Sequence, residues 1–416
     1  MDSTGAVDSP LEQPAQAPHD AVDVIDSREA YLEAVAAIAA GNGPIAIDAE
    51  RASGWRYSQR AYLIQIFRRG AGTFLFDPPA VGSFTELNDV IKNEEWILHA
   101  ASQDLTCLRE VGLDPTRLFD TELAARLAGL PRVGLGTVVE GGVYEPRLGE
   151  WPCRPVRRGV LLGEMDAEQL LDVELLVDLR EALGRILAEA NKTHVAEQEF
   201  VAVLARDFVV VRAEPWRRLN GLHSLRGGKA LAVARALWEA RDDYAREIDT
   251  APGRLIPDAA LTAAAKAMPE TKRDLAGLKE FTGRASRTQI DRWWAAIEAG
   301  KASTDLPNLR VPSDTLPPPR VWSDKNPEAD KRLKAARAAI TELSDELAIP
   351  VENILTPESL RRVAWKPPVK LTVETIAAAL VEVGARPWQV DATAQLIHSA
   401  FVEALQSPEQ ADDAES

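Results

Sequence analysis

Short apolar runs alternate with amphipathic stretches over the first 130 residues. Four runs rich in Ile, Leu, Phe and Ala are predicted strands, at residues 45–50, 62–67, 73–76 and 96–100. Gly70-Ala71-Gly72 separates the second run from the third and predicts a hairpin. Apolar residues three and four apart predict helices at residues 28–40, 84–93, 102–111 and 120–129. Strands that later alternate with helices indicate a mixed sheet covered by helices.

The pattern changes after residue 168, where strand signals nearly vanish and helical spacing dominates. Helices are predicted through 170–207, in several pieces across 215–300, and again over 328–406. Five prolines between residues 302 and 322 are typical of a linker. The predicted organisation is an acidic disordered tail, an α/β domain, a helical domain, a proline-rich linker, a second helical domain and an acidic tail, at residues 1–25, 26–205, 212–300, 301–325, 326–406 and 407–416.

Composition narrows the class of protein. The chain has 416 residues, of which 46% are hydrophobic, and no apolar run of about 18 residues that could span a membrane. The first 26 residues carry six acids and no Lys or Arg, which is unlike a secretory signal. Two distant cysteines, Cys107 and Cys153, exclude a disulfide framework and a cysteine zinc site. We therefore expect a cytoplasmic protein.

Charge is unevenly distributed along the chain. The net charge of −16 excludes a uniformly basic nucleic-acid binder, yet residues 206–300 hold 17 Lys and Arg against 13 acids, a net of +4. The best basic cluster for phosphate contacts lies at the start of the first helical domain and contains Arg217, Arg218, Arg226 and Lys229. An ordinary solvated helix face is the alternative interpretation of this cluster.

Two carboxylates close the first predicted strand. Asp48 and Glu50 are two residues apart, so their side chains point to the same face of the strand. Binding sites in α/β sheets form at such strand ends, and a divalent cation would relieve the repulsion between the two charges. The alternative is a solvated strand end without a ligand.

Two further acids have settings that suit a site. Asp104 follows a buried strand and lies in the first turn of a predicted helix, where an acid also favours the helix dipole. Asp172 lies beside the apolar stripe of a later helix, at the edge of a buried face, and there it needs a partner. A metal ion or an arginine would each serve as that partner.

The ordered set of acids resembles the DEDD 3′–5′ exonucleases, and among them the ribonuclease D family in its actinobacterial form. The resembling segments are Ile47-Asp48-Ala49-Glu50, Ala61-Tyr62-Leu63-Ile64-Gln65-Ile66, His99-Ala100-Ala101-Ser102-Gln103-Asp104-Leu105, Asp120-Thr121-Glu122-Leu123 and Leu171-Asp172-Val173-Glu174. Residues 215–296 resemble an HRDC domain, a helical nucleic-acid module, and the family carries two such modules. The resemblance thus implies an α/β ribonuclease-H-like exonuclease domain followed by two all-α HRDC-like domains.

The same resemblance implies a chemistry. Asp48, Glu50, Asp104 and Asp172 would hold two divalent cations, Mg²⁺ or Mn²⁺, for two-metal hydrolysis of a phosphodiester. The expected activity is 3′–5′ trimming of structured RNA, with tRNA precursors as the substrate class and nucleoside 5′-monophosphates as products. RNA is the expected partner, and the choice between RNA and DNA stays open because no motif reads the 2′-OH.

The third motif departs from the family pattern. Glu168 stands where the family has a tyrosine that orients water, Ala167 stands where a related subgroup has a histidine, and residues 142–170 do not resemble the family. A compensated shift of the reading frame, divergence and a remodelled active site are three explanations. The alternative function is a catalytically impaired nucleic-acid-binding protein on a degenerate exonuclease scaffold.

Overall fold

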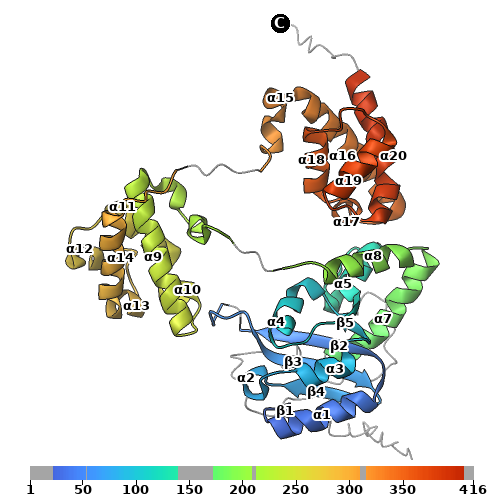
Figure 1. Ribbon diagram of the computed structural model, residues 1–416, viewed down its shortest axis with the longest axis horizontal. Helices are drawn as coiled ribbons and strands as arrows, with labels where there is room; N and C mark the ends of the chain where they lie inside the picture. The colour runs from blue at the N-terminus through green and yellow to red at the C-terminus, as the bar shows by residue number, and fades with distance from the viewer. Residues whose placement is uncertain (1–21, 53, 139–171, 209–211, 310–314, 407–416) are drawn as a thin grey trace, which may run out of the picture.

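A mixed sheet forms the amino-terminal domain of the computed structural model, which describes residues 22–52, 54–138, 172–208, 212–309 and 315–406 (Figure 1). The order of its six strands is β1-β4-β3-β2-β5-β6. Their bounds are β1 Val24–Ile25, β2 Asn42–Arg51, β3 Ala61–Arg69, β4 Gly72–Phe76, β5 Glu95–Leu98 and β6 Arg117–Asp120. The predicted mixed sheet is confirmed, and β1 and β6 are two edge strands that the sequence pattern did not predict.

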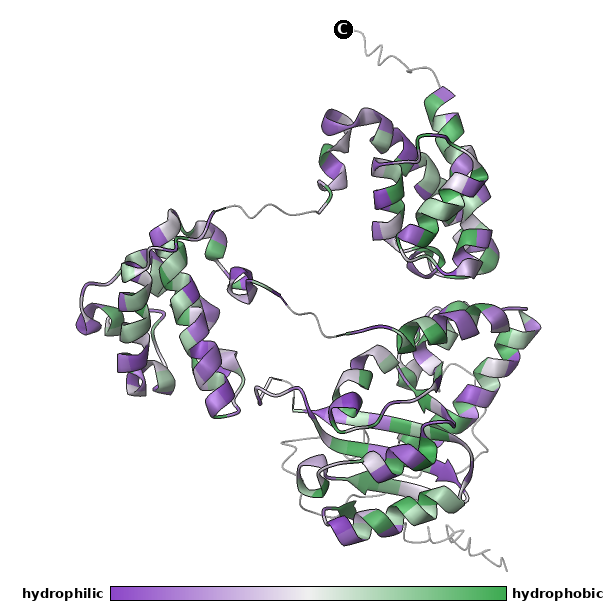
Figure 2. Cartoon of the chain, in the orientation of Figure 1, coloured by the Kyte–Doolittle hydropathy of each residue, from purple (hydrophilic) through white to green (hydrophobic). Residues whose placement is uncertain are grey.

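Pairing within the sheet follows the hydrophobic pattern. β3 runs antiparallel to both β2 and β4, whereas β5 is parallel to β2 and to β6. The hairpin predicted at Gly70-Ala71-Gly72 therefore exists, between β3 and β4. Ile45, Ala46 and Ile47 are fully buried, and Figure 2 shows green hydrophobic segments along the strands. The central strands are thus fixed in register by an apolar core on both faces.

Helices cover the sheet and carry local start signals. Ser27 caps the first helix, where its hydroxyl accepts a hydrogen bond from the Ala30 N–H. The helices of this domain are α1 Arg28–Ala40, α2 Pro78–Val81, α3 Thr85–Ile91, α4 Leu105–Glu110, α5 Thr121–Leu127, α6 Leu135–Val138, α7 Asp172–Glu189 and α8 Thr193–Leu204, with a 3₁₀ turn at Ala101–Gln103 before α4. The predicted helices near 84–93, 102–111 and 120–129 match α3, α4 and α5.

A separate helical module follows, with its own apolar core. Its helices are α9 Gly228–Glu247, α10 Pro252–Leu255, α11 Asp258–Ala267, α12 Lys272–Ala276, α13 Arg284–Thr288 and α14 Ile290–Ala302. Trp293 and Leu237 are fully buried where α14 packs on α9. The two helices approach so closely that a Cβ on Gly300 would lie 2.6 Å from the Val233 Cα, so only glycine fits there.

The second helical module extends further towards the amino terminus than its sequence pattern predicted. Its helices are α15 Trp322–Lys325, α16 Pro327–Leu347, α17 Val351–Ile354, α18 Pro357–Trp365, α19 Val373–Glu382 and α20 Pro387–Gln406. Trp322 is fully buried, with its ring centroid 4.8 Å from that of Trp365. This residue lies within the stretch 301–325 that was predicted as linker, because a single apolar anchor among prolines gives no periodic signal. No helix in the described ranges is long and apolar enough to cross a membrane.

The second module is joined to the amino-terminal domain through α8. The Glu199 carboxylate, only 5% exposed, accepts hydrogen bonds from Arg386 at 2.7 and 2.6 Å and from the Trp388 indole N–H at 2.7 Å. Buried residues of both units form one continuous hydrophobic cluster. The two units therefore share a core and are not merely tethered.

Removal of the Glu199 carboxylate tests this junction. Glu199→Ala leaves the Arg386 guanidinium and the Trp388 N–H without their acceptor in a buried place, which should lower the free energy of unfolding by about 3 kcal/mol. Glu358→Ala is the matched control, since Glu358 pairs with two arginines on an exposed surface and should cost less than about 1 kcal/mol. Urea denaturation measures both, and equal losses would contradict a buried junction.

Candidate active site

The two strand carboxylates lie at the carboxyl end of β2. Asp48 pairs with Gln65 of β3 across the ladder, and the Gln65 Nε2 donates a hydrogen bond of 3.1 Å to the Asp48 Oδ2. Gln65 is 1% exposed, so this amide is a fixed support for the carboxylate. Its role was not predicted, although a lone glutamine inside an apolar strand was a signal that such a partner existed.

Asp104 reaches the same region from the loop that follows β5. Ala100 in that loop has a φ of 60°, a left-handed conformation that is unfavourable for a residue with a Cβ. The Asp120 carboxylate holds the loop, because it accepts the N–H groups of Ala100 and Ala101 at 3.1 and 2.9 Å. It also caps α5 by accepting the N–H groups of Glu122 and Leu123 at 3.0 and 3.1 Å. Asp120 is thus a positioning residue that sequence reasoning placed only within a family motif.

The carboxylates perturb one another. Burial, followed by the charge of Glu50, raises the pKa of Asp48 to about 6. Burial, followed by the charge of Asp48, raises the pKa of Asp104 to about 8, and the nearby Arg51 opposes this rise. Asp48, Glu50 and Asp104 are therefore close enough to repel one another, and their buried surroundings disfavour the charged form. Carboxyl groups with pKa values shifted by burial and by one another are typical of a functional site.

The chemistry of these donors, though not yet a complete set of ligands, suits a hard divalent cation. Oxygen ligands from carboxylates suit Mg²⁺ or Mn²⁺, and a cation would remove the repulsion that raises the two pKa values. The described residues contain no group of three or more acidic, histidine or cysteine side chains in metal-binding arrangement. The fourth predicted ligand, Asp172, is the first residue of α7, a helix that packs against β2 and β3. Its side chain, Glu168 and the window 142–170 fall outside what the structure describes.

The predicted phosphate-binding cluster is largely engaged within the first helical module. Arg217 pairs with Glu214 at 2.7 Å, and Arg226 donates to the backbone carbonyl of His223 at 2.8 Å. The Lys229 ammonium donates to the carbonyls of Lys301 and Ser303 at the end of α14. Arg218 is exposed. Contacts of these side chains with phosphate would have to compete with such internal hydrogen bonds.

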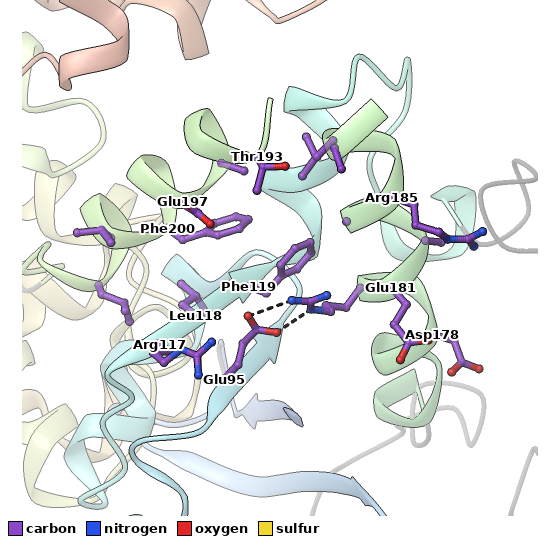
Figure 3. Close-up of a pocket in the computed structure, with 18 of the residues that line it drawn as sticks. Glu95, Arg117, Leu118, Phe119, Asp178, Glu181, Arg185, Thr193, Glu197 and Phe200 are labelled. Carbon is purple, nitrogen blue, oxygen red and sulfur yellow. Dashed lines mark hydrogen bonds and ion pairs between the residues drawn. The ribbon is translucent and has the colours of Figure 1, made fainter. Parts of the chain in front are cut away.

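A cavity of about 1440 Å³ lies elsewhere, between β6, α7 and α8 (Figure 3). Its wall includes Glu95 and Arg117, the first residues of β5 and β6. The cavity thus lies where these strands begin, whereas Asp104 follows the end of β5. Arg180 binds Glu95 with two hydrogen bonds, of 2.6 and 3.2 Å, across this wall. None of the predicted site residues lines the cavity, so it is not the candidate active site.

Models of protein families match all three units of the chain. A 3′–5′ exonuclease model matches residues 22–143, the HRDC domain model matches residues 230–297, and the 3′ to 5′ exonuclease C-terminal domain model matches residues 315–401. The second helical module, predicted to be HRDC-like, thus matches a model of a different name. Fold and family models together define the class of protein, a 3′–5′ exonuclease whose catalytic domain is followed by an HRDC domain and an exonuclease C-terminal domain.

The chain belongs to the ribonuclease D family. It is 30% identical to ribonuclease D of Jannaschia sp. strain CCS1 over 71% of this chain and 76% of that protein, and 28% identical to ribonuclease D of Escherichia coli K12 over 82% and 89%. A crystal structure of a protein from Bifidobacterium adolescentis has a TM-score of 0.78 and 31% identity, and covers 91% of this chain and 97% of that one. The E. coli RNase D structure shares the fold, with a TM-score of 0.62 and 24% identity over 92% of this chain and 99% of that one. The resemblance read from the motifs is therefore confirmed at the level of family.

Replacement of Asp120 tests its positioning role. Asp120→Ala leaves four backbone N–H groups without an acceptor around a residue that is 4% exposed, so unfolding should become easier by about 2 to 4 kcal/mol. Asp120→Asn keeps one carbonyl oxygen and should lose less. Thermal unfolding and urea titration measure the difference, and Asp120→Ala as stable as the wild type would contradict the role.

The raised pKa of Asp104 predicts how stability depends on pH without metal. From about pH 4, where an unfolded Asp ionises, to about pH 8, the native carboxyl keeps a proton that the unfolded chain has lost. Stability therefore falls as pH rises through this window. Asp104→Asn should be more stable than the wild type at pH 8 by about 2 kcal/mol in chelator. Mn²⁺ should stabilise only the wild type, and equal thermal shifts in both proteins would contradict the prediction.

Proposed function

We propose that this protein is a metal-dependent 3′–5′ exoribonuclease that trims structured RNA, with tRNA precursors as its substrate class. The observation that carries the proposal is the convergence of Asp48, Glu50 and Asp104, whose burial and mutual repulsion raise two of their pKa values. We infer that these three acids and Asp172 hold two divalent cations, Mg²⁺ or Mn²⁺. The products would be nucleoside 5′-monophosphates.

Each supporting residue has a definable task in this proposal. A bound divalent cation would supply Lewis acidity and a more acidic water. Gln65 orients the Asp48 carboxylate, because its amide N–H donates to the Asp48 Oδ2. Asp120 holds the loop that presents Asp104, and Asp104 must lose its proton before it can serve as a ligand.

Support for RNA as the partner comes from the family and the helical modules. The E. coli relative is described as an exoribonuclease involved in structured RNA processing. We infer that the first helical module holds the RNA body, with Arg217, Arg218, Arg226 and Lys229 as candidate phosphate contacts, while an unpaired 3′ end enters the carboxylate site. A cytoplasmic location, where RNA precursors are met, is part of the same proposal.

A second candidate is a nucleic-acid-binding protein without catalysis. The observation that favours it is Glu168, which stands where the family pattern has tyrosine. A carboxylate there can hold water or act as a base, yet it adds negative charge to a site that already has four acids. Activity would then be reduced or lost while RNA binding persists.

An exonuclease assay on 3′-extended RNA separates the two candidates. Mg²⁺, Mn²⁺ and chelator are compared for the wild type, for the double variant Asp48→Ala/Glu50→Ala, and for Asp172→Ala. Loss of direct ligands should lower the rate by at least about a hundredfold, since even supporting partners of a metal ligand cost that much. The control Asp89→Ala removes an exposed acid on α3 and should keep wild-type activity.

Release of 5′-monophosphates that requires the metal and is lost in both variants supports the hypothesis of an active exoribonuclease. RNA binding without any release, in either metal, supports the binding protein. Activity that survives in the double variant would contradict the assignment of Asp48 and Glu50.

A further inference from the structure

The loop between β2 and β3 joins the catalytic sheet to the first helical module. The Asp249 carboxylate, which follows α9, accepts hydrogen bonds from the Ser58 N–H and the Tyr62 hydroxyl, each of 2.9 Å. The Tyr57 hydroxyl donates to the Asp242 carboxylate of α9 at 3.0 Å, and the Tyr57 ring packs against the core of that module. The loop, which reaches from the sheet towards α10 in Figure 1, is therefore held by both units.

Trp55 lies in this loop and is held from several sides. The backbone N–H of Trp55 donates to the Ala52 carbonyl at 3.1 Å, and the backbone carbonyl of Trp55 accepts a hydrogen bond from the Ala251 N–H at 3.0 Å. Arg254 of α10 donates through its Nε to the Gly54 carbonyl at 2.9 Å. The guanidinium of the same arginine lies over the indole, with its central carbon 3.2 Å from the ring centroid. A cation on the ring face fixes the orientation of the side chain before any ligand arrives.

The free face of this indole is exposed to solvent. Trp55 is 60% exposed, and among the tryptophans in the described ranges it alone is an exposed large hydrophobic residue. Since Arg254 covers one face of the ring, the exposed area belongs mainly to the other face and the edge. A rigid aromatic surface that is held in place yet left in water is suited to binding, because little side-chain entropy is lost on contact.

The position and charge of the loop identify the chemistry of the ligand. Trp55 follows Glu50 by five residues, directly beyond the strand that carries two of the proposed catalytic carboxylates. Residues 51–61 contain three arginines and no acid, in a chain of net charge −16. Arg56 and Arg60 lie within 4.0 and 3.8 Å of Asp249, so one acid faces two bases. An excess of positive charge beside a flat aromatic ring is the combination that binds single-stranded nucleic acid.

We propose that Trp55, backed by Arg254, is a stacking platform for one unpaired nucleobase of the RNA strand, upstream of the 3′ end that is cleaved. This inference rests on the proposed function, because it assigns a binding site to the same substrate. The platform is built from both units, with the indole from the exonuclease domain and the guanidinium from the first helical module. It therefore links the module that holds RNA to the strand that carries Asp48 and Glu50.

Binding in chelator tests the platform without any catalysis. The full chain and its Trp55→Ala variant are titrated with a labelled single-stranded RNA of twelve nucleotides, followed by fluorescence anisotropy. Loss of one stacked base should weaken binding about tenfold, and Trp55→Phe, which keeps a ring, should restore most of it. Val381→Ala is the matched control, since it truncates an equally exposed apolar side chain on α19.

A scan of abasic positions locates the stacked base. Twelve RNAs that each lack one base are measured against both proteins. At one position the missing base should weaken binding to the wild type about tenfold and leave binding to Trp55→Ala unchanged, because both changes remove the same contact. Strictly additive effects at every position, or wild-type binding by Trp55→Ala, would overturn the proposal and leave the surface to another partner such as a protein.

Turnover distinguishes this proposal from the proposed function. Trp55→Ala should raise the KM for the twelve-nucleotide RNA about tenfold with little change in kcat, whereas hydrolysis of a dinucleotide, which is too short to span both sites, should stay within about twofold of the wild type. A wild type that hydrolyses neither substrate would contradict the exoribonuclease while the chelator experiment still decides on Trp55. Equal losses on both substrates would show a structural defect and overturn the platform.

Discussion

The carboxylate of Asp120 is the constraint on which the geometry of the site depends. Its four backbone hydrogen bonds tie the loop after β5 to the first turn of α5, and they hold Ala100 in a left-handed conformation. This anchor keeps the buried Asp104 close to Asp48 and Glu50, whose charges repel it. The domain thus uses stable local structure to keep an unfavourable arrangement of charges, as functional sites commonly require.

The helical modules are attached to this domain in two different ways. The carboxyl-terminal module shares a hydrophobic core with it, and the buried Glu199 binds Arg386 and Trp388 across the junction. The first module keeps a separate core and contacts the loop after β2 through polar groups such as Asp249. One module is therefore a structural extension of the domain, and the other is positioned by the loop that follows the strand with two of the proposed ligands.

Much of the fold was predictable, because strong patterns depend on local sequence. The central strands and the hairpin at Gly70-Ala71-Gly72 follow from apolar runs and turn residues. β1 and β6 were missed, since two and four residues at the edges of a sheet are too short for a periodic signal. Other features depend on contacts between distant segments, which no local pattern contains. Examples are the hydrogen bond from Gln65 to Asp48 and the hydrogen bond from Lys229 to a carbonyl at the end of α14. The acids were singled out by their local settings, and the prediction that they form one site came from the resemblance of their order to a family.

The central claim is that Asp48, Glu50, Asp104 and Asp172 together hold the catalytic cations. Anomalous diffraction from crystals grown with Mn²⁺ would test it most directly, because it locates the metal independently of activity. The account predicts two manganese peaks bounded by carboxylate oxygens of these four residues, with Asp172 turned towards β2. Well-ordered crystals in which no peak lies beside Asp48 and Asp104, or in which Asp172 points away from them, would contradict it.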